Sequence, residues 1–82
     1  MTLSEMPNLG KVNEERLKEV GIETPEELRA IGTEGAFVQV REVDKGACLH
    51  LLYGLEGAIK GIPKKDICPA RKEALKDFYH RL

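Results

Sequence analysis

The chain has few of the residues on which several common binding chemistries depend. It has no Trp, two Phe and two Tyr, too few aromatic rings for a platform that stacks the bases of single-stranded nucleic acid. Its two cysteines, Cys48 and Cys68, cannot build a disulfide framework, so we expect a reducing, cytoplasmic location. The longest apolar run is too short and too rich in glycine to span a bilayer, and the first residues lack the pattern of a signal peptide. We therefore expect no membrane partner.

Motifs for catalysis and for metal binding are missing as well. Cys48 and His50 are the closest pair of soft ligands, but on a helix their side chains would point about 200° apart and could not share one metal ion. A Cys–His nucleophile pair would lack an orienting third residue and an oxyanion turn. The sequence has neither a P-loop nor a dinucleotide GxGxxG motif. We expect no enzyme activity, no cofactor and no metal site.

The small net charge hides an uneven distribution. The chain has a net charge of −1, with −5 on the first 59 residues and +4 on the last 23. Attraction of the whole chain to DNA is therefore weak, and any nucleic-acid contact must be local. The basic residues of the last segment are Lys60, Lys64, Lys65, Arg71, Lys72, Lys76 and Arg81. They could contact phosphates, but Glu73 and Asp77 interrupt them, which favours the solvated face of a helix.

The stretch from Cys48 to Ile62 predicts the element around which the fold is organised. Nearly every position in it is apolar or small, and a helix that is apolar on most of its circumference is a buried one. We expect this helix to run from about Ala47 to Lys60. Gly54 and Gly57 fall one turn apart in it, and glycine inside a helix costs ~1 kcal/mol against alanine. The pair therefore predicts the close approach of another backbone.

Two capping patterns define the helices of the first half. Asn13 is a good N-cap for a helix from Glu14 to about Val20 that ends at Gly21. The run Thr24-Pro25-Glu26-Glu27 has a capping Thr, Pro at the first helical position and Glu at the third. It predicts a second helix, which ends at Gly32.

Two more helices flank the central one. Thr33 is expected to cap a helix from Glu34 to about Val43, and Pro69 begins the last helix. The last helix has an apolar stripe formed by Ala74, Leu75, Phe78, Tyr79 and Leu82. No segment alternates β-branched and polar residues as a strand does. The sequence thus predicts an all-α protein, a compact bundle of about five short helices in a single domain over residues 1–82.

The turn Pro7-Asn8-Leu9-Gly10-Lys11 resembles the hairpin of helix-hairpin-helix DNA-binding elements. In such elements the turn presents backbone N–H groups beside a helix N-terminus, which is an anion site. The turn also resembles one in the C-terminal domain of the bacterial RNA polymerase alpha subunit. The resemblance implies contact with the backbone of double-stranded DNA through Asn8, Leu9, Gly10, Lys11 and Arg16. The alternative is an ordinary turn whose helix N-terminus faces only water.

Two signatures together resemble the C-terminal domain of the TfoX (Sxy) family of bacterial competence regulators over about residues 5–80. The first is Pro7-Asn-Leu-Gly, Leu17, Gly21-Ile22-x-Thr24-x-x-x-Leu28 and Gly32. The second is Leu51-Leu52-Tyr53-x-Leu55-Glu56-Gly57-Ala58-Ile59-x-Gly61. The resemblance implies a SAM-like or helix-hairpin-helix-like fold and a non-catalytic role in transcriptional or competence control.

Two function classes stay open at this point. The hairpin favours a regulatory module that binds double-stranded DNA with low affinity. The acidic first 59 residues favour a protein-interaction module without direct DNA contact. Its partner would be a transcription-related protein or a second copy of the chain in a homodimer, held by an apolar strip of helix 34–43 or of the last helix.

Overall fold

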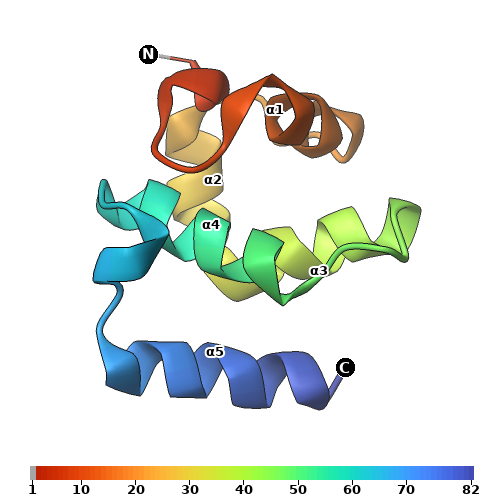
Figure 1. Cartoon of the computed structure of the whole chain (residues 1–82). Helices are drawn as coiled ribbons and strands as arrows, with labels where there is room; N and C mark the ends of the chain where they lie inside the picture. The colour runs from red at the N-terminus through yellow and green to blue at the C-terminus, as the bar shows by residue number, and fades with distance from the viewer. Residues whose placement is uncertain (1) are drawn as a thin grey trace.

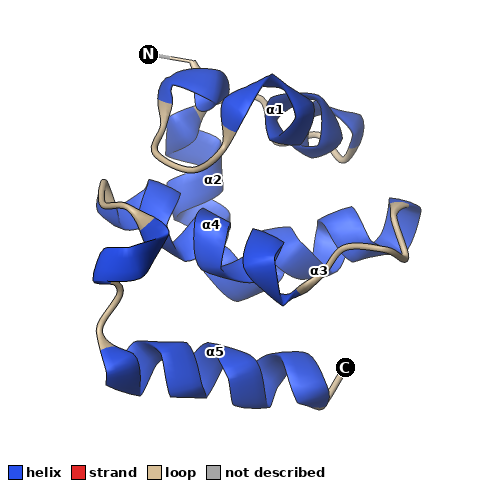
Figure 2. Cartoon of the chain, viewed as in Figure 1, coloured by secondary structure: helices blue, strands red, loops and turns tan. Residues whose placement is uncertain are grey.

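The central helix α4 (Leu49–Lys60) lies between other elements of the fold. In the computed structural model, which describes residues 2–82, η1 and α1 lie on one side of α4 and α5 lies on the other (Figure 1). The remaining elements are the 3₁₀ turns η1 (Leu3–Glu5) and η2 (Lys64–Asp66) and the helices α1 (Gly10–Glu19), α2 (Pro25–Ile31), α3 (Thr33–Val43) and α5 (Pro69–His80). Residues 2–82 contain no strand (Figure 2). The all-α bundle of five helices is therefore confirmed.

The core gathers around α4, as its sequence predicts. Leu52 and Leu55 are fully buried, and α4 contacts α2, α3, α5 and η2. The other large side chains that are fully buried are Leu3, Leu17, Ile22, Leu28, Phe37, Val40 and Leu75. They come from five other elements and from the segment between α1 and α2, so each element adds at most a few anchors to one shared core. Within residues 2–82 no helix is both long and apolar enough to cross a membrane.

The helix ends follow local chemistry in several places. The Thr24 hydroxyl accepts a hydrogen bond from the Glu27 N–H at 3.1 Å, and Pro25 is the first residue of α2. At the end of α1 the Ile22 N–H donates to the Leu17 carbonyl at 2.9 Å, and the Gly21 N–H donates to the Lys18 carbonyl. This pair of bonds is a Schellman motif. These two predicted ends are confirmed.

Two predicted caps are wrong. α1 begins at Gly10, four residues before Glu14, because Leu9 packs into the core with helical backbone angles and the helix starts directly after it. Asn13 therefore lies inside α1, where its Nδ2 donates to the Leu9 carbonyl at 3.0 Å. Thr33 does not cap α3 either. Gly32 is the N-cap, and the Thr33 hydroxyl donates to Glu56 Oε1 at 2.7 Å.

The apolar face of α5 is narrower than its pattern suggests. In α5 only Leu75 is buried, while Phe78 and Tyr79 are partly buried against the core. Ala74 and Leu82 belong to the same predicted stripe but are exposed. A helix that packs against the protein on one side only, as α5 does at the edge of the molecule (Figure 1), buries a single row of side chains.

Candidate nucleic-acid interface

The hairpin turn, residues Met6–Leu9, joins η1 to α1 and is held against the core by its first and last side chains. The side chains of Met6 and Leu9 are both buried. Between them Asn8 has a φ of 71°, the one positive φ of a non-glycine residue in the part of the chain that the structure describes. Asn is among the few side chains that tolerate this left-handed region. Asn8 therefore makes a turn for which glycine is the commoner residue.

The Asn8 side chain also fastens this turn to the far end of α4. Its Nδ2 donates to the Ile62 carbonyl at 3.0 Å, and its Oδ1 accepts from the Lys64 N–H at 3.1 Å. The NH₂ group and the carbonyl oxygen of this one side chain thus both bond to backbone groups about 55 residues away along the chain. A glycine at position 8 could make the turn but neither of these bonds. The hairpin turn and the exit of α4 form one unit.

The glycines of α4 make room for that unit. A Cβ on Gly57 would overlap Asn8 Nδ2 and would lie 2.6 Å from the Ile62 carbonyl oxygen. A Cβ on Gly54 would lie 3.6 Å from Asn8 Cβ and 3.7 Å from the Asn8 carbonyl oxygen, which is ordinary contact. The close approach that the two glycines predict is confirmed. Its partner is the hairpin turn, so the two halves of the family signature touch each other.

Beside this junction the first turn of α1 is open to solvent. Gly10 and Lys11 are exposed, and no side chain of residues 2–82 caps the helix N-terminus. The first N–H groups of a helix have no partner within it and carry the positive end of its dipole. Glu14 lies nearby, but its Oε2 accepts a bond from the Ser4 N–H at 3.0 Å. The α1 N-terminus, with Lys11 beside it, can therefore accept an anion.

The five residues predicted to contact DNA divide into three groups. Gly10 and Lys11 are exposed at the start of α1, as a phosphate contact requires. Leu9 is directed into the core, so only its backbone faces the turn. Asn8 and Arg16 line one pocket, where the Asn8 side chain is engaged in its two bonds and Arg16 Nε lies 3.3 Å from Asp44 Oδ2.

This pocket, called the hairpin pocket below, has a volume of about 200 Å³. Its walls come from the hairpin turn, α1, the start of α4 and η2. They are Asn8, Asn13, Arg16, Cys48, His50, Leu51, Gly54 and Lys64. From the sequence, Asn13 is expected only as a helix cap, His50 is considered as a metal ligand, and Lys64 is only one of seven basic residues of the tail. The pocket itself could not be predicted, because four separate segments supply its walls and no contiguous motif marks them.

The basic tail does not form one free patch. Arg71 donates through Nη2 to Glu34 Oε1 at 2.9 Å and to Glu56 Oε1 at 3.1 Å, and its Nε lies 3.1 Å from Glu56 Oε2. Lys60 Nζ lies 3.0 Å from the same Oε2. This oxygen accepts no well-aligned hydrogen bond within residues 2–82, so charge rather than hydrogen bonding holds it. Two of the seven basic side chains, Lys60 and Arg71, are therefore paired with Glu56, although the Lys60 side chain is 52% exposed.

Glu56 is the buried carboxylate at the centre of this cluster, with 2% of its surface exposed. Burial by itself would raise the pKa of Glu56, but the contacts of its carboxylate with Arg71, Thr33 and Lys60 outweigh burial and lower the pKa to about 2. The pKa of Arg71 is raised because its hydrogen bonds to Glu56 and Glu34 favour the charged guanidinium. Both groups stay ionised, and they join α3, α4 and α5.

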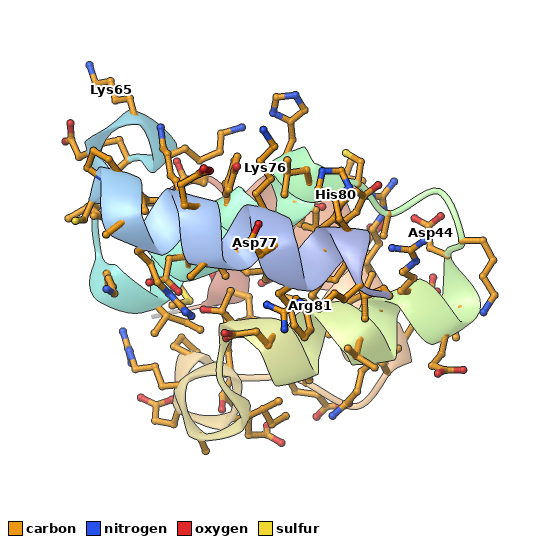
Figure 3. The ribbon with its side chains drawn as sticks, turned by 90° about the horizontal axis from the view of Figure 1, so that it is seen from below. Asp44, Lys65, Lys76, Asp77, His80 and Arg81 are labelled. Atoms are coloured by element: carbon orange, nitrogen blue, oxygen red, sulfur yellow. The ribbon has the colours of Figure 1, made fainter. Side chains whose placement is uncertain are left out.

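The other basic residues of the tail lie at separate places on the surface. Figure 3 shows Lys76 and Arg81 on opposite edges of α5, with Asp77 between them and Lys65 pointing outward at η2. Lys72 Nζ lies 5.9 Å from the centre of the Tyr53 ring. A negative side chain in the middle of this surface weakens any continuous phosphate track.

Comparison with known proteins places this fold in a family. The model of the TfoX C-terminal domain matches residues 1–79. Protein Sxy of Escherichia coli (strain K12) is 32% identical over 76 residues, which cover 93% of this chain but 36% of Sxy. The chain therefore spans about a third of the length of this curated relative.

Two crystal structures from Listeria monocytogenes have the same fold. One, of an uncharacterized protein in a triclinic form, has a TM-score of 0.98 and 43% identity over 99% of this chain and 92% of that one. The other, of a protein of unknown function in a tetragonal form, has a TM-score of 0.94 and 44% identity over 96% of each chain. With its family model matched almost end to end, the chain belongs to the TfoX C-terminal domain family.

Proposed function

We propose that the chain is a non-enzymatic regulatory module that contacts the backbone of double-stranded DNA through the start of α1. Such a module would act in transcriptional or competence control, the role implied by the family that the sequence resembles. One observation carries the proposal: the uncapped, exposed N-terminus of α1 is held in place by a rigid turn and has Lys11 beside it. Backbone N–H groups at a helix N-terminus bind phosphate without regard to base sequence.

The rigidity of the turn supports the proposal as well. Leu9 is buried on one side of the exposed Gly10 and Lys11, and the Asn8 side chain makes two bonds to the exit of α4. A phosphate would therefore meet donors that are already in position, which saves the entropy of ordering a flexible loop. With a net charge of −1 on the chain, the affinity would depend on these few contacts and would be low.

Titration of a labelled duplex by fluorescence anisotropy tests this proposal. At about 50 mM salt we expect binding, and the affinity should fall with a slope of about 0.9 for each phosphate neutralised. Lys11→Glu should weaken binding by about 5–10-fold, the effect of one lost phosphate contact and one added repulsion. Lys18→Glu is the matched control, because Lys18 is also exposed but lies in the last turn of α1.

The outcome that contradicts the proposal is equally clear. If the wild-type chain does not bind duplex DNA at about 50 mM salt, where phosphate contacts are strongest, the DNA function is wrong. Equal losses for Lys11→Glu and Lys18→Glu would show that only net charge matters. Gly10 is a poorer place for the test, because its φ of 67° makes any side chain there strained.

A second candidate function, self-association, rests on a separate groove between α3 and the end of the chain. The groove has a volume of about 180 Å³ and is lined by Val38, Arg41, Glu42, Lys45 and Leu82. Val38 is 37% exposed and Leu82 is 52% exposed, so two large apolar side chains meet solvent in the same groove. Sedimentation velocity at high protein concentration tests this candidate: a dimer that Val38→Glu converts to monomer would support it, and a monomer at every concentration would exclude it.

A further inference from the structure

The hairpin pocket has a chemical character that the rest of the chain does not share. The chain as a whole has one more acidic than basic residue. Around the pocket, however, Arg16, His50 and Lys64 come together from α1, α4 and η2. No Asp or Glu is among the residues of the described chain that line it. A hollow lined by cations and amides, with no carboxylate in its walls, favours an anionic group.

We propose that the hairpin pocket binds a phosphate group, as a second contact beside the α1 N-terminus. The source of that phosphate in the cell, the backbone of duplex DNA, rests on the proposed function. The phosphate chemistry itself rests only on the pocket.

The donors are of the types that phosphate binding uses. The guanidinium of Arg16 and the ammonium of Lys64 supply charge-assisted hydrogen bonds. Asn13 Nδ2 donates one of its two protons to the Leu9 carbonyl, which leaves the second proton for a ligand. Arg16 Nε lies 3.3 Å from Asp44 Oδ2, and its side chain is 40% exposed, so this surface ion pair is weak and competes little with a phosphate.

The N-terminus of α4 adds to this set. Cys48 is both the N-cap of α4 and a pocket residue, and no side chain within residues 2–82 caps the helix. The positive end of the dipole of this 12-residue helix therefore lies at the wall of the pocket that Arg16 and Lys64 also line.

The size of the pocket selects a small group. Pockets that enclose a drug-sized or nucleotide-sized ligand have volumes of roughly 300–1,000 Å³, and the hairpin pocket has about 200 Å³. A single phosphate of a polymer, whose sugar and base remain outside, fits this volume better than a whole nucleotide does.

The pocket and the α1 N-terminus are parts of one rigid unit. Asn8 lines the pocket, and its Oδ1 accepts the bond from the Lys64 N–H that fixes the backbone of η2. The position of Lys64 thus depends on the same turn that places Gly10 and Lys11. Two phosphate contacts held by one turn would fix the orientation of a DNA backbone on the protein, which one contact could not do.

The test compares two adjacent lysines in duplex-DNA titrations of the full chain. Lys64 lines the pocket, whereas Lys65 points outward from η2 (Figure 3). Both are exposed, so Lys64→Glu and Lys65→Glu change the net charge equally and should both fold. We expect Lys64→Glu to weaken binding by about 5–10-fold and to reduce the salt slope by about one, and Lys65→Glu to change affinity less than about 2-fold. Equal effects of the two substitutions would overturn the proposal.

A second measurement separates this inference from the proposed function. Inorganic phosphate is titrated into the ¹⁵N-labelled chain, and the amide shifts of Asn13, His50 and Lys64 are followed. Shifts that saturate in the wild type and are lost in Lys64→Glu support the pocket, even if duplex DNA does not bind and the proposed function is wrong. If DNA binds and Lys11→Glu weakens it, but phosphate leaves these amides unmoved and Lys64→Glu has no effect on DNA binding, the function stands and the pocket inference fails.

Discussion

Two adjacent residues of α4 fasten different parts of the molecule by opposite means. Gly57 lets the hairpin turn approach because it has no side chain, and Asn8 completes that junction with two neutral hydrogen bonds. Glu56 holds Thr33 of α3 and Arg71 of α5 with a buried charge. The hairpin junction, Asn8 with Gly57 and Ile62, thus depends on shape. The carboxylate junction, Glu56 with Thr33 and Arg71, depends on ionisation.

The difference predicts different sensitivities for the two junctions. An added methyl group disrupts the first, because its closest atoms are backbone and a hydrogen-bonded amide that cannot move freely. A lost charge disrupts the second, because the partly buried guanidinium of Arg71 would keep its cost of desolvation without the carboxylate that offsets it. The first junction should not respond to pH, while the second should weaken in acid.

The largest expected effect is that of Gly57→Ala. The new methyl would overlap Asn8 Nδ2 and crowd the Ile62 carbonyl, so overpacking and the loss of Asn8 bonds should together cost about 4 kcal/mol. Gly54→Ala is the matched control in the same helix, because its methyl meets ordinary contacts at 3.6 Å and 3.7 Å. Since alanine favours a helix by ~1 kcal/mol, Gly54→Ala should be neutral or slightly stabilising.

Urea unfolding followed by circular dichroism measures both variants. If Gly57→Ala and Gly54→Ala have the same free energy of unfolding, the claim that the hairpin junction depends on shape is wrong. That result would mean that the turn can move away from α4 at little cost.

The next effect, Glu56→Gln, probes the charged junction. The ordinary pKa of a glutamate side chain is 4.5, and the pKa of Glu56 in the folded protein is about 2. A carboxyl with a lowered folded pKa stabilises the protein above its unfolded pKa, and this contribution is lost as pH falls. Here the contribution is on the order of 3 kcal/mol at neutral pH and disappears between pH 4.5 and about pH 2. Glu56→Gln should therefore destabilise the protein strongly at pH 7.

The measurement is urea unfolding of wild type and Glu56→Gln at several pH values. The difference between them should shrink as the pH falls below 4.5, because the wild-type carboxyl then becomes neutral too. A difference that stays constant with pH would instead indicate a misfit of the amide. Glu34→Gln is the control: its side chain is 39% exposed in its pair with Arg71, so it should cost no more than about 1 kcal/mol.

The helices and their ends could be predicted from the sequence more reliably than the tertiary contacts between them. The buried helix, the two glycines and the Thr24 cap are local patterns, and each is where the sequence placed it. The partner of Gly57 could not be predicted, because Asn8 lies 49 positions away and looks like an ordinary turn residue. In the sequence, Glu56 stands out only as part of the second signature. Its pairing with Arg71 could not be predicted, because periodicity does not show which carboxylate contacts which arginine.

The candidate site shows the same limit. The turn could be predicted from five contiguous residues, but the start of α1 was predicted at Glu14 and lies at Gly10. The direction of Leu9 into the core and the pairing of Arg16 with Asp44 could not be predicted, because both depend on tertiary packing. The hairpin pocket is assembled from four segments, so only the folded chain brings its walls together.

The most direct test of the account is a double-mutant cycle on Asn8 and Gly57. Asn8→Gly suits the φ of 71° but loses two hydrogen bonds, so alone it should cost about 1–2 kcal/mol. In Asn8→Gly/Gly57→Ala the methyl no longer meets the amide of Asn8, and the double variant should be more stable than the sum of the single effects by over about 1 kcal/mol. Additivity within about 0.5 kcal/mol would contradict the claim that the hairpin turn and α4 form one junction.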